Sequence, residues 1–127
     1  MKILVIDDHP ANLKLAGDVL EWQGHEVARA VDANDALVSI SMVRPEVILM
    51  DIELPGMDGL QLTRQLKSDP DTASIPVIAL TAYAMKGDEE KALGAGCDGY
   101  LTKPINTRTL GRQIAEIVAS ASLSNPS

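Results

Sequence analysis

The feature that most constrains the fold of this chain is a fivefold alternation between short apolar runs and segments with helical spacing. Four of the runs are apolar almost throughout, which is typical of strands buried on both faces of a parallel sheet. The fifth alternates apolar and polar residues, as expected of an edge strand. The predicted strands cover residues 2–6, 25–30, 47–50, 75–80 and 99–101.

A helical segment follows each predicted strand. The first begins at Pro10, where the missing N–H costs nothing, and closes at Gly24. The second is capped by Asp32 or Asn34 and stops before Pro45. The other three are expected to open at residue 58 or 59, to run over 86–96, and to be capped by Asn106 or Thr107. Strands that alternate with helices predict an α/β fold, a doubly wound (βα)5 unit with five parallel strands.

Polar residues follow four of the five predicted strands, at the sheet edge where doubly wound folds carry their functional crevice. The second strand has no such anchor and is placed outermost. In the order 2-1-3-4-5 the winding reverses between strands 1 and 3, which brings Asp8 and Asp51 face to face. The polar residues at this edge are Asp7, Asp8, Asp51, Thr81 and Lys103.

Three carboxylates in one crevice need a cation or a proton. At about 4 Å and an effective dielectric of about 20, each pair repels by on the order of 4 kcal/mol. Two or three carboxylates suit Mg²⁺, which keeps several waters and is often completed by a phosphate. Lys103, the Thr81 hydroxyl and the backbone N–H groups of Ala82 and Glu53 suit that phosphate. Asp51, between the metal side and the lysine, is the candidate nucleophile that takes up a phosphoryl group.

Composition narrows the function classes. The chain has 127 residues, for which we expect one domain over 1–121 and a flexible tail over 122–127. Its net charge of −7 argues against a nucleic-acid surface and against an anionic membrane surface. One cysteine, Cys97, cannot form an internal disulfide, which favours a reducing cytoplasm. No apolar run approaches the roughly 20 residues of a membrane span.

Together these motifs resemble the response-regulator receiver domains of bacterial two-component phosphorelays. The resemblance covers about residues 2–121. Its motifs are "DD" at 7–8, "MDIELPGMDG" at 50–59, "LTA" at 80–82 and "GAGCDGYLTKP" at 94–104.

The resemblance implies a flavodoxin-like fold and a role for each site residue. Asp51 would be the phosphoacceptor, and Mg²⁺ would be held by Asp8, Asp51, the backbone carbonyl of Glu53 and, through water, Asp7. Lys103 would contact the phosphoryl oxygens, Thr81 would be the switch hydroxyl, Tyr100 the switch aromatic, and Lys103–Pro104 a cis peptide. The implied donor is a sensor histidine kinase or a histidine phosphotransfer protein. A downstream protein partner would read the surface of helix 4, strand 5 and helix 5.

Three other functions fit parts of the pattern less well. A haloacid-dehalogenase-like phosphohydrolase needs an aspartate where Glu53 stands and a cap domain. A flavin carrier on the same fold needs a Ser/Thr-rich phosphate loop and more aromatics. A receiver-like scaffold that never takes phosphate would not need the complete acceptor set. We also expect a solitary or N-terminal receiver, and we interpret His9 as a solvated residue at the start of the first helix.

Overall fold

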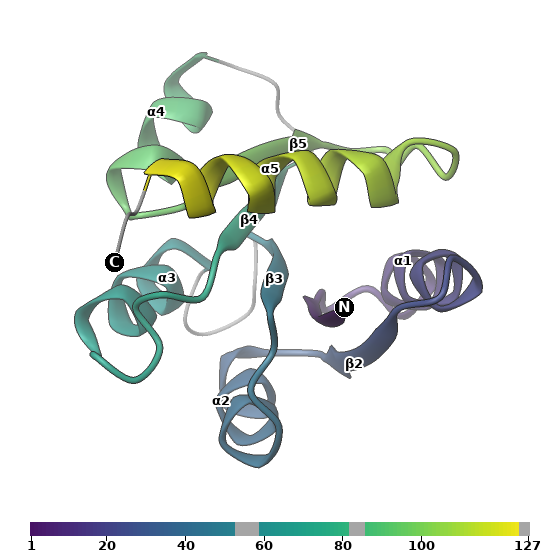
Figure 1. The fold of residues 1–127 in the computed structure, drawn as a ribbon, viewed down its shortest axis with the longest axis horizontal. Coiled ribbons are helices and arrows are strands. Elements are labelled where there is room, and N and C mark those ends of the chain that lie inside the picture. The colour runs from purple at the N-terminus through teal and green to yellow at the C-terminus, as the bar shows by residue number, and fades with distance from the viewer. Residues whose placement is uncertain (53–58, 82–85, 125–127) are drawn as a thin grey trace.

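The computed structural model describes residues 1–52, 59–81 and 86–124, and it has the predicted fold (Figure 1). Five parallel strands form one sheet in the order β2-β1-β3-β4-β5. The strands are β1 (Lys2–Ile6), β2 (Glu26–Ala30), β3 (Val47–Asp51), β4 (Val77–Thr81) and β5 (Gly99–Thr102). The helices are α1 (Pro10–Trp22), α2 (Ala33–Met42), α3 (Gly59–Ser68), α4 (Lys86–Gly94) and α5 (Leu110–Ser124).

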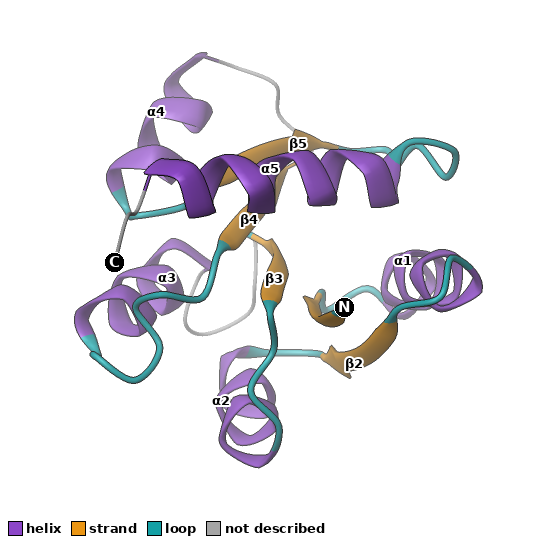
Figure 2. Cartoon of the chain, in the orientation of Figure 1, coloured by secondary structure: helices purple, strands orange, loops and turns teal. Residues whose placement is uncertain are grey.

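The helices cover both faces of the sheet (Figure 2). On one face α1 and α5 pack on β1, β3 and β4 through apolar residues such as Leu20 and Ile114. On the other face α2, α3 and α4 pack on the same strands through Leu62, Leu66 and Ala92. The apolar residues of β1, β3 and β4 alternate between these two clusters, so both faces of the central strands are buried.

The burial of each strand follows its sequence pattern. Every residue of β3 and β4 is buried, as their continuous apolar runs predicted. The alternating strand β2 is mostly exposed and lies at one edge, as predicted, and β5 forms the other edge. The central strands therefore hold their last residues, Asp51 and Thr81, inside the core.

The predicted helix ends are partly confirmed. Gly24 follows α1 with a φ of 95°, and the Asp32 side chain caps α2 by accepting from the N–H of Asp35. The predicted caps of the last helix are wrong, since α5 begins at Leu110. Asn106 instead accepts the N–H of Arg108 and forms a turn before the helix.

Other element boundaries differ by a few residues. The fourth strand starts at Val77 rather than at residue 75, because residues 75 and 76 still belong to the preceding loop. The fourth helix ends at Gly94, two residues early. The last helix continues to Ser124, past the expected domain end at 121, and the flexible tail over 122–127 stays a prediction. Within the described residues, no helix is both long and apolar enough to cross a membrane.

One partly buried ion pair joins three elements at the amino edge of the sheet. The ammonium of Lys67, at the end of α3, donates to Asp98 Oδ2 (2.9 Å) and to the carbonyls of Ala73 (3.1 Å) and Ile75 (2.8 Å). The same Asp98 oxygen accepts the N–H of Val77, the first residue of β4. The side chains of Lys67 and Asp98 are only 20% and 28% exposed, so water replaces these bonds poorly.

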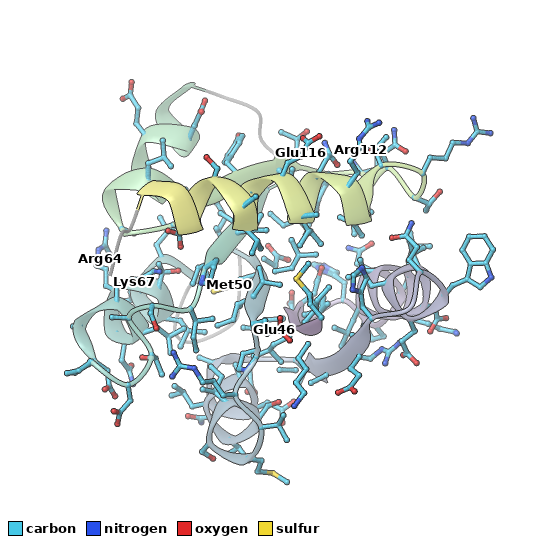
Figure 3. The ribbon with its side chains drawn as sticks, in the orientation of Figure 1. Glu46, Met50, Arg64, Lys67, Arg112 and Glu116 are labelled. Carbon is cyan, nitrogen blue, oxygen red and sulfur yellow. The ribbon has the colours of Figure 1, made fainter. Side chains whose placement is uncertain are left out.

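We expect Lys67→Met to lower the free energy of unfolding by about 2 kcal/mol, because it removes the lysine donor from a partly buried carboxylate and from two carbonyls. Urea denaturation followed by circular dichroism measures this change. The matched control is Arg112→Met, which breaks a pair with Glu116 on the outer face of α5 (Figure 3), where both side chains are about 70% exposed. That control should cost at most about 0.5 kcal/mol, and equal losses in the two variants would contradict the expectation.

Candidate functional site

The carboxyl ends of four strands bring the predicted polar residues to one edge of the sheet. Asp51 ends β3 and Thr81 ends β4, while Asp7 directly follows β1 and Lys103 directly follows β5. The pairing of Ile6 with Met50 places Asp7 level with Asp51 on the neighbouring strand. The topology therefore gathers side chains that are far apart in the chain.

Three carboxylates form a compact cluster at this edge. One oxygen each of Asp7, Asp8 and Asp51 and a ring nitrogen of His9 all lie within 4.8 Å of one another. Asp7 and Asp51 are 2% and 1% exposed, so water screens their charges weakly. Carboxylates at this separation repel by on the order of 3 kcal/mol per pair at an effective dielectric of about 20. The fold therefore concentrates negative charge here at a cost in stability.

Lys103 is the positive charge that faces this cluster. Its ammonium donates to Asp51 Oδ2 at 2.7 Å and lies 3.8 Å from Asp7 Oδ2. The Lys103 side chain is 16% exposed, so the contact with Asp51 is a partly buried ion pair. The N–H of Lys103 donates to the carbonyl of Thr81, which fixes the residue beside β4. The peptide bond that follows, Lys103–Pro104, is cis, as predicted.

The environment of Asp7 favours its neutral form. Burial raises the pKa of the Asp7 carboxyl above its usual value, and the charge of Asp51 raises it further. The N–H of His9, which donates to Asp7 Oδ1 at 2.9 Å, and the charge of Lys103 oppose this shift. One lysine therefore does not compensate the cluster fully.

The residues present suit a hard divalent cation. The Oδ1 atom of Asp8 is buried and accepts no hydrogen bond within the described residues, although His9 Nδ1 lies 3.2 Å away. A buried oxygen without a donor is costly unless a ligand satisfies it. The donor set is rich in carboxylate oxygen, which is the ligand type that Mg²⁺ prefers. The cluster therefore fits the predicted metal.

Gly59 brings α3 against the end of β3. A Cβ atom at this position would lie 2.6 Å from the carbonyl oxygen of Asp51 and 2.7 Å from the Cα of Ile52. The N–H of Gly59 also donates to the carbonyl of Ile52. The first turn of α3 thus packs directly on the backbone that carries Asp51, which only glycine permits.

The remaining predicted residues are placed in part. Thr81 is fully buried at the end of β4. Tyr100 is half-buried in β5, where it packs against the core cluster on the side of α2, α3 and α4. Glu53 and Ala82, the predicted sources of backbone ligands, lie outside the described residues.

Sequence reasoning missed the contact of His9 with the acidic pair. The imidazole is 61% exposed at the N-cap of α1, in line with the solvated residue that we expected. Its Nδ1 atom nevertheless lies 3.3 Å from Asp7 Oδ1 and 3.2 Å from Asp8 Oδ1. The available signal was the position directly after "DD", but the direction of the side chain depends on the backbone at the start of the helix.

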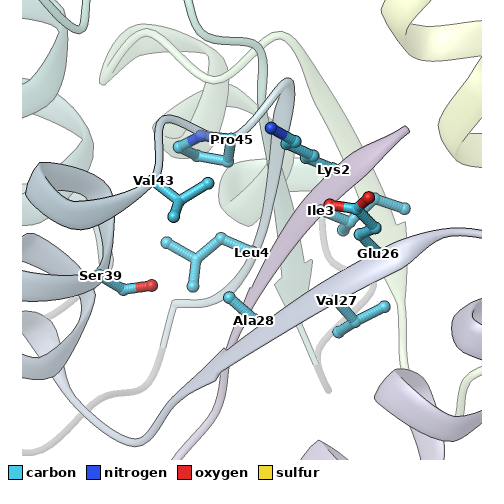
Figure 4. Close-up of a pocket in the computed structure, with 9 residues that line it drawn as sticks. All are labelled: Lys2, Ile3, Leu4, Glu26, Val27, Ala28, Ser39, Val43 and Pro45. Atoms are coloured by element: carbon cyan, nitrogen blue, oxygen red, sulfur yellow. The ribbon is translucent and has the colours of Figure 1, made fainter.

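Two pockets show how the site relates to the rest of the surface. One of about 360 Å³ opens beside Lys103 and is lined by Asn12, Leu15, Lys103, Pro104 and Ile105. Another, of about 150 Å³, lies between α2 and the edge strand β2 (Figure 4). Because its lining includes the first residues of β1 and β2, it lies at the amino edge, away from the carboxylates.

Comparison with known proteins identifies receiver domains as similar in sequence and in structure. The Response regulator receiver domain family matches residues 3–115. The polar-differentiation response regulator DivK of Brucella anthropi is 44% identical over 104 residues, which is 82% of this chain and 85% of that protein.

Two solved structures show the same fold over almost the whole chain. The chemotaxis response regulator CheY4 of Vibrio cholerae superposes with a TM-score of 0.86 at 26% identity, over 91% of this chain and 97% of that one. A response regulator receiver domain protein of Clostridium thermocellum gives 0.83 at 28% identity, over 98% of both chains. The chain therefore belongs to the response regulator receiver domain family, and it is a phosphoacceptor signalling protein rather than a conventional enzyme.

Proposed function

We propose that Asp51 is the residue that accepts the phosphoryl group, and that a phosphohistidine of a sensor histidine kinase or of a histidine phosphotransfer protein supplies it. The observation that carries this proposal is the position of Asp51. Its carboxylate is almost fully buried, contacts Lys103 at 2.7 Å and belongs to the acidic cluster. A nucleophile thus lies within reach of both a cation that suits phosphoryl oxygens and a cluster that suits a metal.

The transfer exchanges one bond to phosphorus for another. A carboxylate oxygen of Asp51 attacks the phosphorus, the P–N bond to the donor imidazole breaks, and the electron pair leaves with that imidazole. The product is an aspartyl phosphate. Lys103 would stabilise the charge on the phosphoryl oxygens, which is the main demand of such a reaction.

We assign Mg²⁺ to the acidic cluster, with Asp8 and Asp51 as direct ligands. By resemblance to the family, the backbone carbonyl of Glu53 completes the protein ligands and Asp7 contributes through water. The metal would neutralise negative charge on the phosphoryl group as it is transferred. Residues Thr81, Ala82 and Glu53 would supply the other donors to that group, the last two through their backbone N–H groups.

The switch that we propose starts at Thr81. A phosphoryl group on Asp51 adds about two negative charges and three acceptors. The buried Thr81 hydroxyl, one position beyond the residue that pairs with Asp51, would turn to donate to it. Tyr100 would then move deeper into the core, which alters the surface of α4, β5 and α5 that a downstream protein reads.

We further propose that the receiver acts in the cytoplasm, and that its domain spans residues 1–121. The donor that it needs is a phosphohistidine protein of that compartment, and its single cysteine, Cys97, is buried. The net charge of −7 supports protein partners rather than nucleic acid or an anionic membrane.

The acceptor can be tested by intact-mass measurement after incubation with acetyl phosphate and Mg²⁺. We expect a gain of one phosphate on the wild type and none on Asp51→Asn, because the amide is a poor nucleophile. Asp71→Asn, which changes an exposed aspartate in the loop before β4, should keep the full gain. A phosphate on Asp51→Asn would show that another residue is the acceptor.

The charge cluster predicts that Asp7→Asn stabilises the protein in metal-free buffer. Removal of one charge relieves repulsion, and we expect a gain of about 1–2 kcal/mol in the free energy of unfolding. Because the pKa of Asp7 is raised, wild-type Asp7 takes up its proton early on acidification, so the gain should shrink as pH falls.

Urea titrations at several pH values, with and without Mg²⁺, measure this difference. Saturating Mg²⁺ should reduce the stability difference between Asp7→Asn and the wild type, since the ion compensates the negative charge of the cluster. Glu116→Gln, at an exposed site on α5, should change stability by less than about 0.5 kcal/mol. A loss of stability in Asp7→Asn would show that the attraction of Asp7 to Lys103 outweighs its repulsion by the other carboxylates.

The switch predicts that Thr81→Ala still takes phosphate but no longer moves Tyr100. NMR signals of the Tyr100 ring, recorded before and after acetyl phosphate and Mg²⁺, report this movement. Thr63→Ala is the matched control, because Thr63 is equally buried but donates to the carbonyl of Gly59 in α3. The control should respond as the wild type does. An unchanged Tyr100 response in Thr81→Ala would refute the role of the hydroxyl.

A further inference from the structure

The acidic cluster includes a ring nitrogen that could bind a metal, in addition to its carboxylate oxygens. His9 Nδ1 lies 3.2 Å from Asp8 Oδ1 and 3.3 Å from Asp7 Oδ1. The imidazole comes from the residue that follows the acidic pair, so the same turn of chain offers two carboxylates and one ring nitrogen. The reasoning below rests on the metal site proposed above and concerns which metals that site prefers.

The spacing of these atoms is that of ligands around one ion. Two donors bound at about 2.1 Å to a common ion lie about 3.0 Å apart at right angles and about 3.4 Å apart at a tetrahedral angle. The distances from His9 Nδ1 to the two carboxylate oxygens fall between these values. One cation could therefore contact Asp8 and His9 together after a small adjustment.

The Nδ1 atom of His9 already forms a hydrogen bond with Asp7 Oδ1 at 3.3 Å, and a bound metal ion would take the place of that hydrogen bond. His9 is the N-cap residue of α1, but its side chain makes no capping hydrogen bond. Its backbone N–H donates to Asp7 Oδ1 at 2.9 Å, which fixes the backbone position from which the side chain extends. The ring itself is 61% exposed, so it can turn without disturbing the core. Asp8 Oδ1, its neighbour, accepts no hydrogen bond within the described residues.

We propose that His9 is a metal ligand that widens the selectivity of this site from Mg²⁺ toward first-row transition-metal ions. Imidazole suits zinc, copper, iron and nickel, whereas carboxylate and water suit magnesium. A nitrogen ligand therefore adds more to the affinity of the site for such an ion than to its affinity for Mg²⁺. With His9 as a ligand, the site binds Zn²⁺, Ni²⁺ or Co²⁺ through Asp8, Asp51 and the imidazole, and these ions compete with Mg²⁺.

The test compares Co²⁺ and Mg²⁺ binding to the full chain and to His9→Asn. Asparagine suits the N-cap position and keeps an oxygen donor, so the variant removes only the nitrogen ligand. Isothermal titration gives both affinities, and the visible absorption of Co²⁺ and the paramagnetic shifts of histidine ring protons report nitrogen ligation. His25→Asn is the matched control, because it removes the other histidine, which lies before β2 and far along the chain from the cluster.

We expect His9→Asn to weaken Co²⁺ binding by at least about tenfold, the scale typical of disturbed metal sites, and to change Mg²⁺ affinity by less than about twofold. The control should bind both ions as the wild type does. An unchanged Co²⁺ affinity in His9→Asn overturns the proposal, and so does equal weakening for both ions, which would indicate an electrostatic effect. Loss of Co²⁺ ligation in His25→Asn instead would place the ion at another site.

Failure of the metal site itself is distinguishable from these outcomes. If Asp8→Asn leaves Mg²⁺ and Co²⁺ binding unchanged, the acidic cluster is not the metal site, and the assignment of Mg²⁺ falls together with the role of His9. If Asp8→Asn abolishes binding of both ions while His9→Asn leaves both unchanged, the metal site stands and only the role of His9 is rejected.

Discussion

The site depends on the repulsion between buried carboxylates at the carboxyl edge of the sheet. Asp7 and Asp51 are almost fully buried, oxygen atoms of Asp7, Asp8 and Asp51 lie within 4.8 Å of one another, and Lys103 is the lysine that faces them. A protein that folded only for stability would avoid this arrangement. Under the proposed function, a metal ion would supply positive charge that offsets this cost, and a phosphoryl group would be bound by the lysine. The uncompensated negative charge of this cluster would thus both destabilise the fold and attract a cation.

The sequence was sufficient for the sheet order and for most of the site because two simple rules coincide. Apolar runs such as 47–50 identify central strands, and parallel strands end at the same edge. Any polar residue directly after such a run, as with Asp7, Asp51 and Lys103, must then lie at that edge. The missing anchor after β2 placed that strand outermost in the expected order 2-1-3-4-5, and the structure confirms this order. No contact had to be known for these predictions.

Features that depend on side-chain direction or on a single turn were beyond the sequence. The contact of His9 with two carboxylates follows from the backbone at the N-cap of α1, which no spacing rule describes. The start of α5 was misplaced because Asn106 has the chemistry of a helix cap but uses it in a preceding turn. The ion pair between Lys67 and Asp98 joins residues 31 positions apart. The apolar pattern of their segments does not predict which charged residues meet.

The ion pair between Lys67 and Asp98 also restrains the elements that it joins. Lys67 and Asp98 tie the end of α3 to the loop before β4 and to the first residue of β4, and Asp98 itself lies next to the start of β5. Sliding of these elements at the amino edge would break several hydrogen bonds at once. Thr81 ends β4 at the opposite edge of the sheet, and Tyr100 in β5 pairs with Ala79 midway along β4. If the proposed switch displaces Thr81, the hydrogen bonds of Lys67 and Asp98 would oppose movement of the amino ends of these strands.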